Sequence, residues 1–120
     1  MDNLKARTAF ITGGTSGIGF GMASVFARAG MNVVISDVRD KELERAGQEL
    51  RQISGNVLTL NVDSTDQSAL EAASAEIRQT FGNHHVLCNN AGIPGGGKIL
   101  ETPDERWRNT HEVNFWGPLN

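Results

Sequence analysis

The 120-residue sequence lacks several features that mark particular classes of protein. Its single cysteine, Cys88, excludes an internal disulfide and suits a reducing compartment. No stretch approaches the ~20 apolar residues of a membrane-spanning helix. The N-terminus reaches Gly13 after too few apolar residues for a signal peptide. These absences predict a soluble, cytoplasmic protein that does not associate with membranes.

Neither sign of charge predominates, because 11 basic and 14 acidic residues are scattered along the chain. No basic block is present, and nucleic acid is therefore not an expected partner. His84 and His85 are adjacent, but no cluster of cysteines or carboxylates accompanies them. The sequence accordingly predicts no metal site. Its length fits one domain at most.

Short apolar runs alternate with longer amphipathic segments along the whole chain. Strands are expected over residues 8–12, 32–37, 56–62 and from 85, and helices over residues 18–29, 41–53, 66–81 and 102–117. In the first helix the predicted core-facing stripe comprises Ile18, Met22, Val25, Phe26 and Ala29. The last helix is expected to open with a capping box formed by Thr102 and Glu105. Four alternations of strand and helix predict an α/β fold with a parallel sheet covered on both faces.

The segment FITGGTSGIGFG places five glycines in twelve residues, directly after the first apolar run. The spacing is Gly13-x-x-x-Gly17-x-Gly19. Glycines at such a turn let the chain leave the strand sharply, let a phosphate approach and let the helix pack closely. Thr15 and Ser16 would add hydroxyl donors. A tight turn without any ligand is the alternative.

Asp37 favours the ligand-binding alternative. It ends the second predicted strand, 18 positions after Gly19, close to the ~20 expected of an acid that binds a ribose. Its carboxylate can accept both ribose hydroxyls and would repel a 2′-phosphate. We therefore predict NAD as the cofactor, with NADP less favoured but kept open by Arg39, whose guanidinium could reach such a phosphate.

Four motifs in this order resemble the short-chain dehydrogenase/reductase family: TGGTSGIG at 12–19, NVD at 61–63, NNAG at 89–92 and VNFWG at 113–117. The resemblance covers the whole chain. It implies a Rossmann-type, doubly wound parallel sheet, truncated after about four strands and four helices. Residues 1–120 would then form the NAD(P)-binding domain, the N-terminal half of such an enzyme.

The resemblance also implies roles for individual residues. Asp37 would bind the adenine ribose, and Asn61 and Val62 would flank the adenine, with Asp63 as the alternative to Asn61. The remaining residues are assigned by region. The pyrophosphate and adenosine side would be lined by Gly13, Thr15, Ser16, Gly17, Ile18 and Gly19, and the nicotinamide-side ribose by Asn90, Ala91 and Gly92. A structural role for Asn89 and Asn90, tying neighbouring strand ends together, is compatible with this assignment.

The family's chemistry needs a tyrosine, a lysine four positions later and an upstream serine, and this sequence contains no tyrosine. Only Asn114 matches a catalytic position. We therefore expect the cofactor half of an oxidoreductase that transfers hydride between a nicotinamide cofactor and an alcohol or ketone, cut from a longer chain and inactive alone. A non-catalytic dinucleotide-binding module is the alternative. The substrate's identity is not readable from these residues.

The end of the sequence carries two further expectations. The fourth strand would have an uncovered edge, so the fragment should self-associate, and we expect a homo-oligomer for the full-length protein. Pro118 has no amide to donate to the Asn114 carbonyl, which predicts either a kinked helix or a helix that ends at Gly117. The family resemblance favours the kink.

Overall fold

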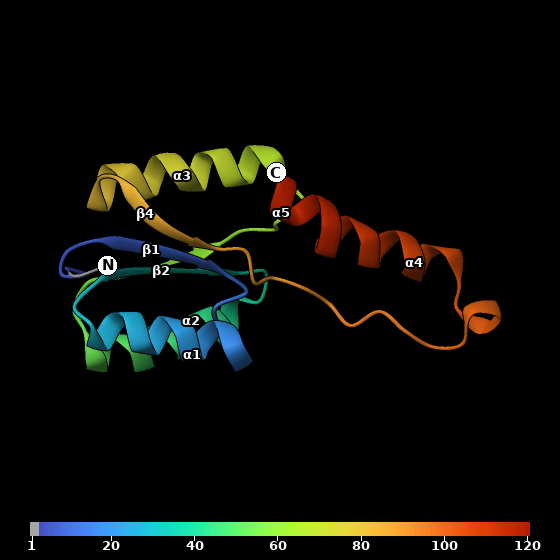
Figure 1. Ribbon diagram of the computed structural model, residues 1–120, viewed down its shortest axis with the longest axis horizontal. Coiled ribbons are helices and arrows are strands. Elements are labelled where there is room, and N and C mark those ends of the chain that lie inside the picture. Colours follow the sequence, from blue (N-terminus) through green and yellow to red (C-terminus); the bar gives the residue numbers. More distant parts are fainter. Residues whose placement is uncertain (1–2) are drawn as a thin grey trace.

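The computed structural model describes residues 3–120, and strands alternate with helices throughout (Figure 1). The strands are β1 (Thr8–Thr12), β2 (Asn32–Asp37), β3 (Val57–Asn61) and β4 (His84–Cys88). The helical elements are α1 (Gly17–Arg28), α2 (Asp40–Ile53), α3 (Gln67–Phe81), η1 (Ile99–Glu101), α4 (Asp104–His111), η2 (Glu112–Trp116) and α5 (Gly117–Leu119). No helix within residues 3–120 is long and apolar enough to cross a membrane.

The four strands form one parallel sheet in the order β3-β2-β1-β4. The alternating pattern predicted the parallel sheet, although not the order of its strands. The pairing of β1 with β4 shifts by one residue, so that Thr8 lies opposite His84 but Ala9 lies opposite Val86. The intervening His85 accepts a hydrogen bond from the Thr8 amide through Nδ1, at 3.0 Å. The imidazole ring of His85 thus gives the Thr8 amide a hydrogen-bond acceptor at the point where the strand pairing shifts.

Helices cover both faces of the sheet, with α1 and α2 on one side and α3 on the other (Figure 1). Each face has its own apolar core. Ile11, Val33 and Ile35 anchor the core under α1 and α2, whereas Phe10 and Val34 pack against Ile77 of α3. Neighbouring residues of the central strands thus point alternately into one core and the other, as a strand's period of two requires.

The buried face of α1 differs from the predicted stripe. The side chains of Ile18 and Val25 are 79% and 61% exposed. The buried residues are Gly19, Ala23, Ser24 and Ala27 instead. Small residues let the helix backbone approach the sheet closely, and the larger Met22 and Phe26 are partly buried and pack against the same core. The predicted stripe is therefore right for Met22 and Phe26 and wrong for Ile18 and Val25.

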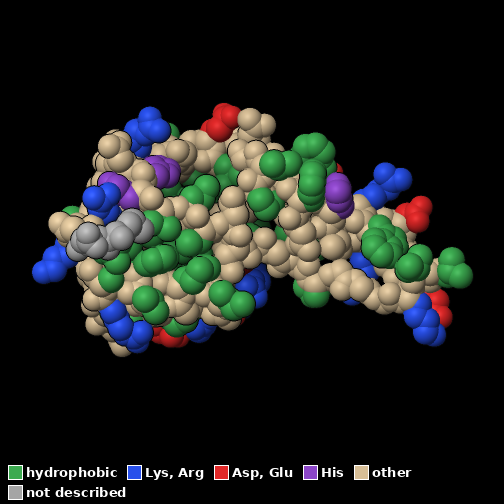
Figure 2. Space-filling model, in the orientation of Figure 1, with side chains coloured by type: hydrophobic (Ala, Val, Ile, Leu, Met, Phe, Trp, Pro, Cys, Tyr) green, Lys and Arg blue, Asp and Glu red, His purple; other side chains and the backbone are tan. Residues whose placement is uncertain are grey.

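The segment from Gly92 through α4 extends away from the sheet as an arm (Figure 1). The molecule accordingly measures 50 × 29 × 25 Å. Hydrophobic side chains come to the surface on this arm (Figure 2), among them Leu100, which is 99% exposed, and Trp107, which is 45% exposed. The predicted capping box at the start of α4 is absent. Pro103 is the N-cap, and the Thr102 hydroxyl donates to the Lys98 carbonyl at 2.9 Å instead.

Candidate cofactor-binding site

The turn after β1 is packed so tightly that its glycines are required. Gly13 has a φ of +64°, and a Cβ there would lie 2.9 Å from the Ala91 Cα. A Cβ on Gly19 would meet the Gly13 carbonyl and lie 2.5 Å from the Asn90 side-chain nitrogen. A Cβ on Gly14, which the sequence analysis did not single out, would lie 2.5 Å from Ile35 Cγ2. The loop therefore fits directly against the neighbouring strand ends.

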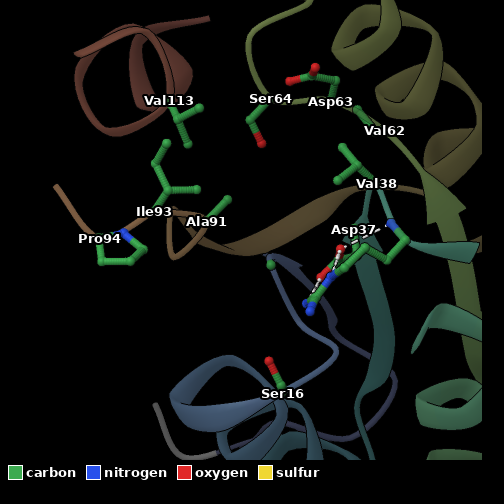
Figure 3. A pocket seen from close by; sticks show the side chains of 13 residues that line it. Ser16, Asp37, Val38, Val62, Asp63, Ser64, Ala91, Ile93, Pro94 and Val113 are labelled. Atoms are coloured by element: carbon green, nitrogen blue, oxygen red, sulfur yellow. Dashed lines mark hydrogen bonds and ion pairs between the residues drawn. The ribbon is translucent and has the colours of Figure 1, made fainter. Parts of the chain in front are cut away.

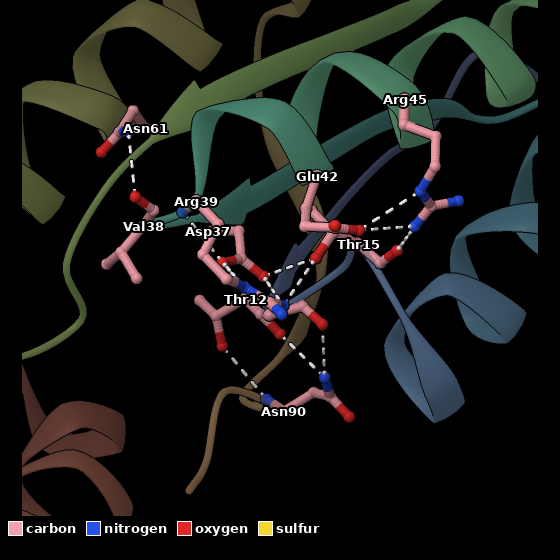
Figure 4. Close-up of polar contacts among 10 residues, drawn as sticks. Thr12, Thr15, Asp37, Val38, Arg39, Glu42, Arg45, Asn61 and Asn90 are labelled. Atoms are coloured by element: carbon pink, nitrogen blue, oxygen red, sulfur yellow. Dashed lines mark hydrogen bonds and ion pairs between the residues drawn. The ribbon is translucent and has the colours of Figure 1, made fainter.

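Asn90 ties the end of β4 to this turn. Its side-chain amide donates to the carbonyls of Thr12 and Gly13, both at 3.0 Å. The Thr12 hydroxyl in turn accepts from the amides of Asn90 and Ala91, at 3.1 and 3.0 Å (Figure 4). These contacts support the structural role considered for Asn90. They also fix where Ala91 and Gly92 leave the sheet.

The N-terminus of α1 is left without a cap of its own. Its N-cap residue, Ser16, makes no side-chain cap hydrogen bond, and the first turn contains no acidic residue. The N-cap residues of α2 and α4 also make no side-chain cap hydrogen bond, although both helices have acidic residues in their first turns, whereas the Asp66 side chain caps α3 by accepting from the Ala69 amide at 3.1 Å. Gly17 has a φ of +55° and open space around the position of its missing Cβ. First-turn amides without a side-chain cap are suited to an anion such as a phosphate.

Asp37, at the end of β2, carries a negative charge beside the glycine-rich turn. Its side chain is only 8% exposed and forms a bidentate ion pair with Arg39, whose Nε and Nη2 each lie 2.9 Å from a carboxylate oxygen. Burial by itself raises the pKa of Asp37. The hydrogen bonds from Arg39 and Thr15 and the Arg39 charge outweigh this effect and lower the pKa to about 2. The carboxylate is therefore fully ionised at neutral pH.

The Thr15 side chain points in a different direction from the one that the sequence predicts. Its side chain is buried, and its hydroxyl donates to Asp37 Oδ2 at 2.5 Å rather than standing free in the loop as a phosphate donor. Arg39 Nη2 donates to the same hydroxyl at 3.1 Å, and Arg45 of α2 donates to the Thr15 carbonyl at 2.7 Å (Figure 4). Thr15 thus links the glycine loop to the segment that follows β2.

A cavity of about 510 Å³ lies between these elements, within the ~300–1,000 Å³ usual for small-molecule sites. Figure 3 shows Ser16, Asp37 with Val38, and Ile93 with Val113 around it. The complete lining comprises Gly13, Ser16, Asp37, Val38, Arg39, Val62, Asp63, Ser64, Ala91, Gly92, Ile93, Pro94 and Val113. The carboxyl ends of parallel strands thus meet at one hollow, where such sheets bind ligands.

The structure separates two alternatives at the end of β3. Asp63 lines the cavity, together with Val62, and its carboxylate accepts from the amide and hydroxyl of Thr65. Asn61 does not line it. The Asn61 amide donates to Asp40 Oδ1 at 2.5 Å and to the Val38 carbonyl at 3.4 Å. Of the two polar residues, Asp63 is therefore the one that lines the cavity.

Asn114 connects the arm to the cavity wall. Its side-chain oxygen accepts from the Ile93 amide at 2.8 Å, and its side-chain nitrogen donates to the Ile93 carbonyl at 2.9 Å. The backbone around it forms one turn of π-helix, η2, in which the Gly117 amide reaches back five residues to the Glu112 carbonyl. The helix therefore does not end at Gly117, because α5 continues to Leu119, and it is not a regular α-helix around Asn114. Its widened turn coincides with Asn114.

Comparison with known proteins places the chain in a family. A family model described as short chain dehydrogenase matches residues 7–120. The chain belongs to the short-chain dehydrogenase family. It is 39% identical over 116 residues to 1-deoxy-11-beta-hydroxypentalenate dehydrogenase of Streptomyces exfoliatus, covering 95% of this chain and 42% of that protein.

Solved structures of short-chain dehydrogenases have the same fold. A short-chain dehydrogenase/reductase from Burkholderia phymatum in complex with NAD matches with a TM-score of 0.94 and 31% identity, over 99% of this chain and 42% of that one. L-sorbose reductase from Gluconobacter frateurii, complexed with NADPH and L-sorbose, matches with a TM-score of 0.89 and 31% identity, over 99% and 46%. The chain thus spans less than half the length of these relatives.

Within this short-chain dehydrogenase fold, the predicted site residues separate into two groups. Gly13, Ser16, Asp37, Val62, Ala91 and Gly92 line the cavity. Thr15, Gly17, Ile18, Gly19, Asn61, Asn90 and Asn114 do not line it. Gly19, Asn90 and Asn114 instead pack or hydrogen-bond against segments that contribute to the wall.

Several lining residues were missed by the sequence analysis. Val38, Ser64 and Ile93 directly follow motif residues, so proximity in sequence could have indicated them. Val113 opens the VNFWG motif and directly precedes Asn114, so the same signal could have indicated it, although it is distant in sequence from the other lining residues. Within residues 3–120 no cluster of three or more His, Cys, Asp or Glu side chains is arranged to hold a metal ion.

Proposed function

We propose that this chain is the cofactor-binding part of an NAD(P)-dependent oxidoreductase that transfers hydride between a nicotinamide cofactor and an alcohol or ketone. The observation that carries the proposal is that one cavity is lined both by Ser16, the N-cap residue of α1 that makes no side-chain cap hydrogen bond, and by the ionised carboxylate of Asp37. An anion site and a hydrogen-bond acceptor for hydroxyls match the pyrophosphate and ribose of a dinucleotide.

In this proposal, each part of the cavity lining binds a different part of the cofactor. The α1 amides and Ser16 hold the pyrophosphate, Asp37 holds the adenine ribose, and Val62 with Asp63 borders the adenine. Ala91 and Gly92 border the nicotinamide-side ribose, and Asn114 keeps that segment in place through Ile93. When bound, the cofactor supplies or accepts the hydride. The 120 residues contain no tyrosine, so the tyrosine that the family resemblance requires as proton donor is not among them.

NAD is the favoured cofactor in this proposal, because an ionised carboxylate repels a 2′-phosphate. Among similar structures, the Burkholderia phymatum protein is in complex with NAD and the Gluconobacter frateurii reductase with NADPH, so family membership alone is compatible with either. A small alcohol or carbonyl compound, a cytoplasmic location and a homo-oligomeric full-length protein complete the proposal. A dinucleotide-binding module without chemistry is the alternative.

Calorimetric titration with NAD tests the binding. The protein should be expressed with whatever sequence follows residue 120 in its gene. Asp37→Asn should weaken NAD binding about tenfold, because two charge-assisted hydrogen bonds to the ribose become weaker neutral ones. Asp104→Asn makes the same chemical change at the exposed start of α4 and should leave NAD binding unaltered. Absence of NAD binding by the unsubstituted protein would refute the proposal.

Consumption of NADH separates the two functions. The gene product should oxidise NADH in the presence of at least one member of a panel of ketones and aldehydes, whereas the 120-residue chain alone should oxidise none. NAD binding by a gene product that consumes no NADH across the panel would favour the non-catalytic module.

A further inference from the structure

We propose that Arg45 of α2 is a positioning residue of the cofactor site, which holds the Thr15 carbonyl and thereby orients the Ser16 amide toward the pyrophosphate of the cofactor. This inference rests on the proposed function, because it concerns the anion-binding part of the same cavity. Arg45 does not line that cavity. Its effect on the cofactor is therefore transmitted through the glycine-rich loop before α1.

The contact between Arg45 and the loop fixes one peptide plane. Arg45 Nη2 donates to the Thr15 carbonyl at 2.7 Å. Hydrogen bonding within α1 begins one residue later, where the Ser16 carbonyl accepts from the Phe20 amide at 3.2 Å. The C=O and the N–H of one trans peptide unit point in opposite directions. The hydrogen bond that holds the Thr15 carbonyl therefore also sets the direction of the Ser16 amide, at a residue that lines the cavity.

The guanidinium of Arg45 is itself held in place. Its Nη1 donates to Glu49 at 2.7 Å, and its Nε and Nη2 donate to one oxygen of Glu42 at 3.2 and 3.1 Å (Figure 4). Its Cζ also lies 5.9 Å from the centroid of the Phe20 ring. The donors of a guanidinium have a rigid, planar arrangement. Two carboxylates of the same helix thus direct the remaining donor at the Thr15 carbonyl before any ligand binds.

The loop needs this support because little else fixes the peptide between Thr15 and Ser16. Ser16 has an extended backbone, with a φ of −152°, and makes no side-chain cap hydrogen bond. Gly17 follows with a φ of +55°, and glycine adopts many other conformations at little cost. The Thr15 hydroxyl is bound to Asp37, but a side-chain contact leaves rotation about the next backbone bonds open. Without Arg45 this peptide can rotate and turn its amide away from an anion.

The charges around Arg45 separate positioning from simple attraction of the anion. Glu42 and Glu49 together outweigh the single positive charge of Arg45, so the cluster as a whole would repel a pyrophosphate. If the cluster acted only through its charge, removing one carboxylate would strengthen binding of the anion. If Arg45 acts by position, the same change weakens binding, because the guanidinium loses one of the groups that direct it. The two accounts therefore predict effects of opposite sign.

The experiment uses ADP-ribose, which contains the pyrophosphate but no nicotinamide, so the result is independent of hydride transfer. It is titrated calorimetrically into the gene product and into Arg45→Gln, Arg45→Lys, Glu42→Gln and Arg51→Gln. Arg51 is exposed in the last turn of α2, so its substitution makes the same charge change on the same helix away from the loop. The melting temperature of each variant shows whether it is folded, and Glu42→Gln keeps the test decisive if Arg45→Gln does not fold.

Arg45→Gln should weaken binding of ADP-ribose about tenfold, and Glu42→Gln about threefold. Arg45→Lys keeps the charge but lacks the planar set of donors, so it should stay at least about threefold weaker than the unsubstituted protein. Arg51→Gln should change the affinity by no more than about twofold.

Three results would overturn the inference and leave the proposed function standing. They are unchanged or tighter binding by Glu42→Gln, full recovery of affinity in Arg45→Lys, and equal affinities of Arg45→Gln and Arg51→Gln. Failure of the unsubstituted protein to bind ADP-ribose would overturn both the inference and the proposed function.

Discussion

At the residue scale, two glycines of the same helix differ in what surrounds them. A Cβ on Gly19 would collide with the Gly13 carbonyl and the Asn90 amide, whereas a Cβ on Gly21 would meet nothing within 4 Å. Alanine is favoured over glycine inside a helix by about 1 kcal/mol. Gly21→Ala should therefore stabilise the protein by up to about 1 kcal/mol. Gly19→Ala should destabilise it by about 1–3 kcal/mol through overpacking.

Denaturant unfolding of both variants measures this contrast. Opposite signs of the two free-energy changes are expected. Equal effects would show that the close packing of Gly19 against the turn does not contribute to stability.

Asp37 predicts a dependence of stability on pH. Its pKa is lowered from 3.8 to about 2 in the folded protein, so the ionised pair stabilises the fold fully above about pH 4 and loses this contribution as the pH falls toward 2. The melting temperature of Asp37→Asn should therefore lie below that of the unsubstituted protein at pH 6. This difference should shrink as the pH is lowered to 2. Thermal melts across this range test it, and a difference that stays constant would contradict the assignment.

Residue roles were the least predictable part of the site. The sequence correctly placed Asp37, Val62 and the glycines at the carboxyl ends of the strands, because motif and strand pattern fix those positions. It could not show that Thr15 turns inward to Asp37 or that Asn61 turns to Asp40. Those orientations depend on partners brought close only by the completed sheet.

At the scale of elements, strands were predicted better than helix faces. β1 and β2 match their predicted bounds, since short β-branched runs have few alternatives. The predicted burial of Ile18 and Val25 in α1 and the predicted capping box of α4 were wrong. In both places tertiary packing decides: α1 needs small residues against the sheet, and Thr102 is engaged by the preceding turn.

Arg45 links α2 to the glycine-rich loop before α1. It extends from α2 to the Thr15 carbonyl, and its guanidinium is held in place by Glu42 and Glu49. Arg45→Ala should increase hydrogen exchange at the amides of residues 13–17, because the loop loses this tie. Arg51→Ala, another exposed arginine of α2, is the control and should leave exchange there unchanged. Identical exchange in both variants would exclude a bracing role.

The pair of hydrogen bonds between Asn114 and Ile93 joins η2 to the segment after β4. Asn114→Asp removes the donor and places a carboxylate against the Ile93 carbonyl. We expect a loss of about 1–2 kcal/mol of unfolding free energy. Asn109→Asp makes the same change on the exposed surface of α4 and should have a smaller effect. Equal losses in denaturant unfolding would mean that the Asn114 contacts do not hold the arm.

At the scale of the whole molecule, the sheet and the arm differ in how they are stabilised. The sheet has a core on each face, whereas α4 has no buried residue within the described chain. The radius of gyration of 15.2 Å exceeds the ~14 Å of a compact domain of this length. The alternation of elements predicted the sheet, but the outward course of the arm had no signal in the sequence. The expected self-association through the β4 edge stays a prediction.

The central claim is that one cavity binds a dinucleotide with its pyrophosphate at α1 and its adenine ribose at Asp37. A crystal structure of the gene product with NAD tests this most directly. The account predicts pyrophosphate oxygens within hydrogen-bond distance of the amides in the first turn of α1. It also predicts ribose hydroxyls within hydrogen-bond distance of the Asp37 carboxylate. A cofactor bound elsewhere, or with its ribose away from Asp37, would contradict it.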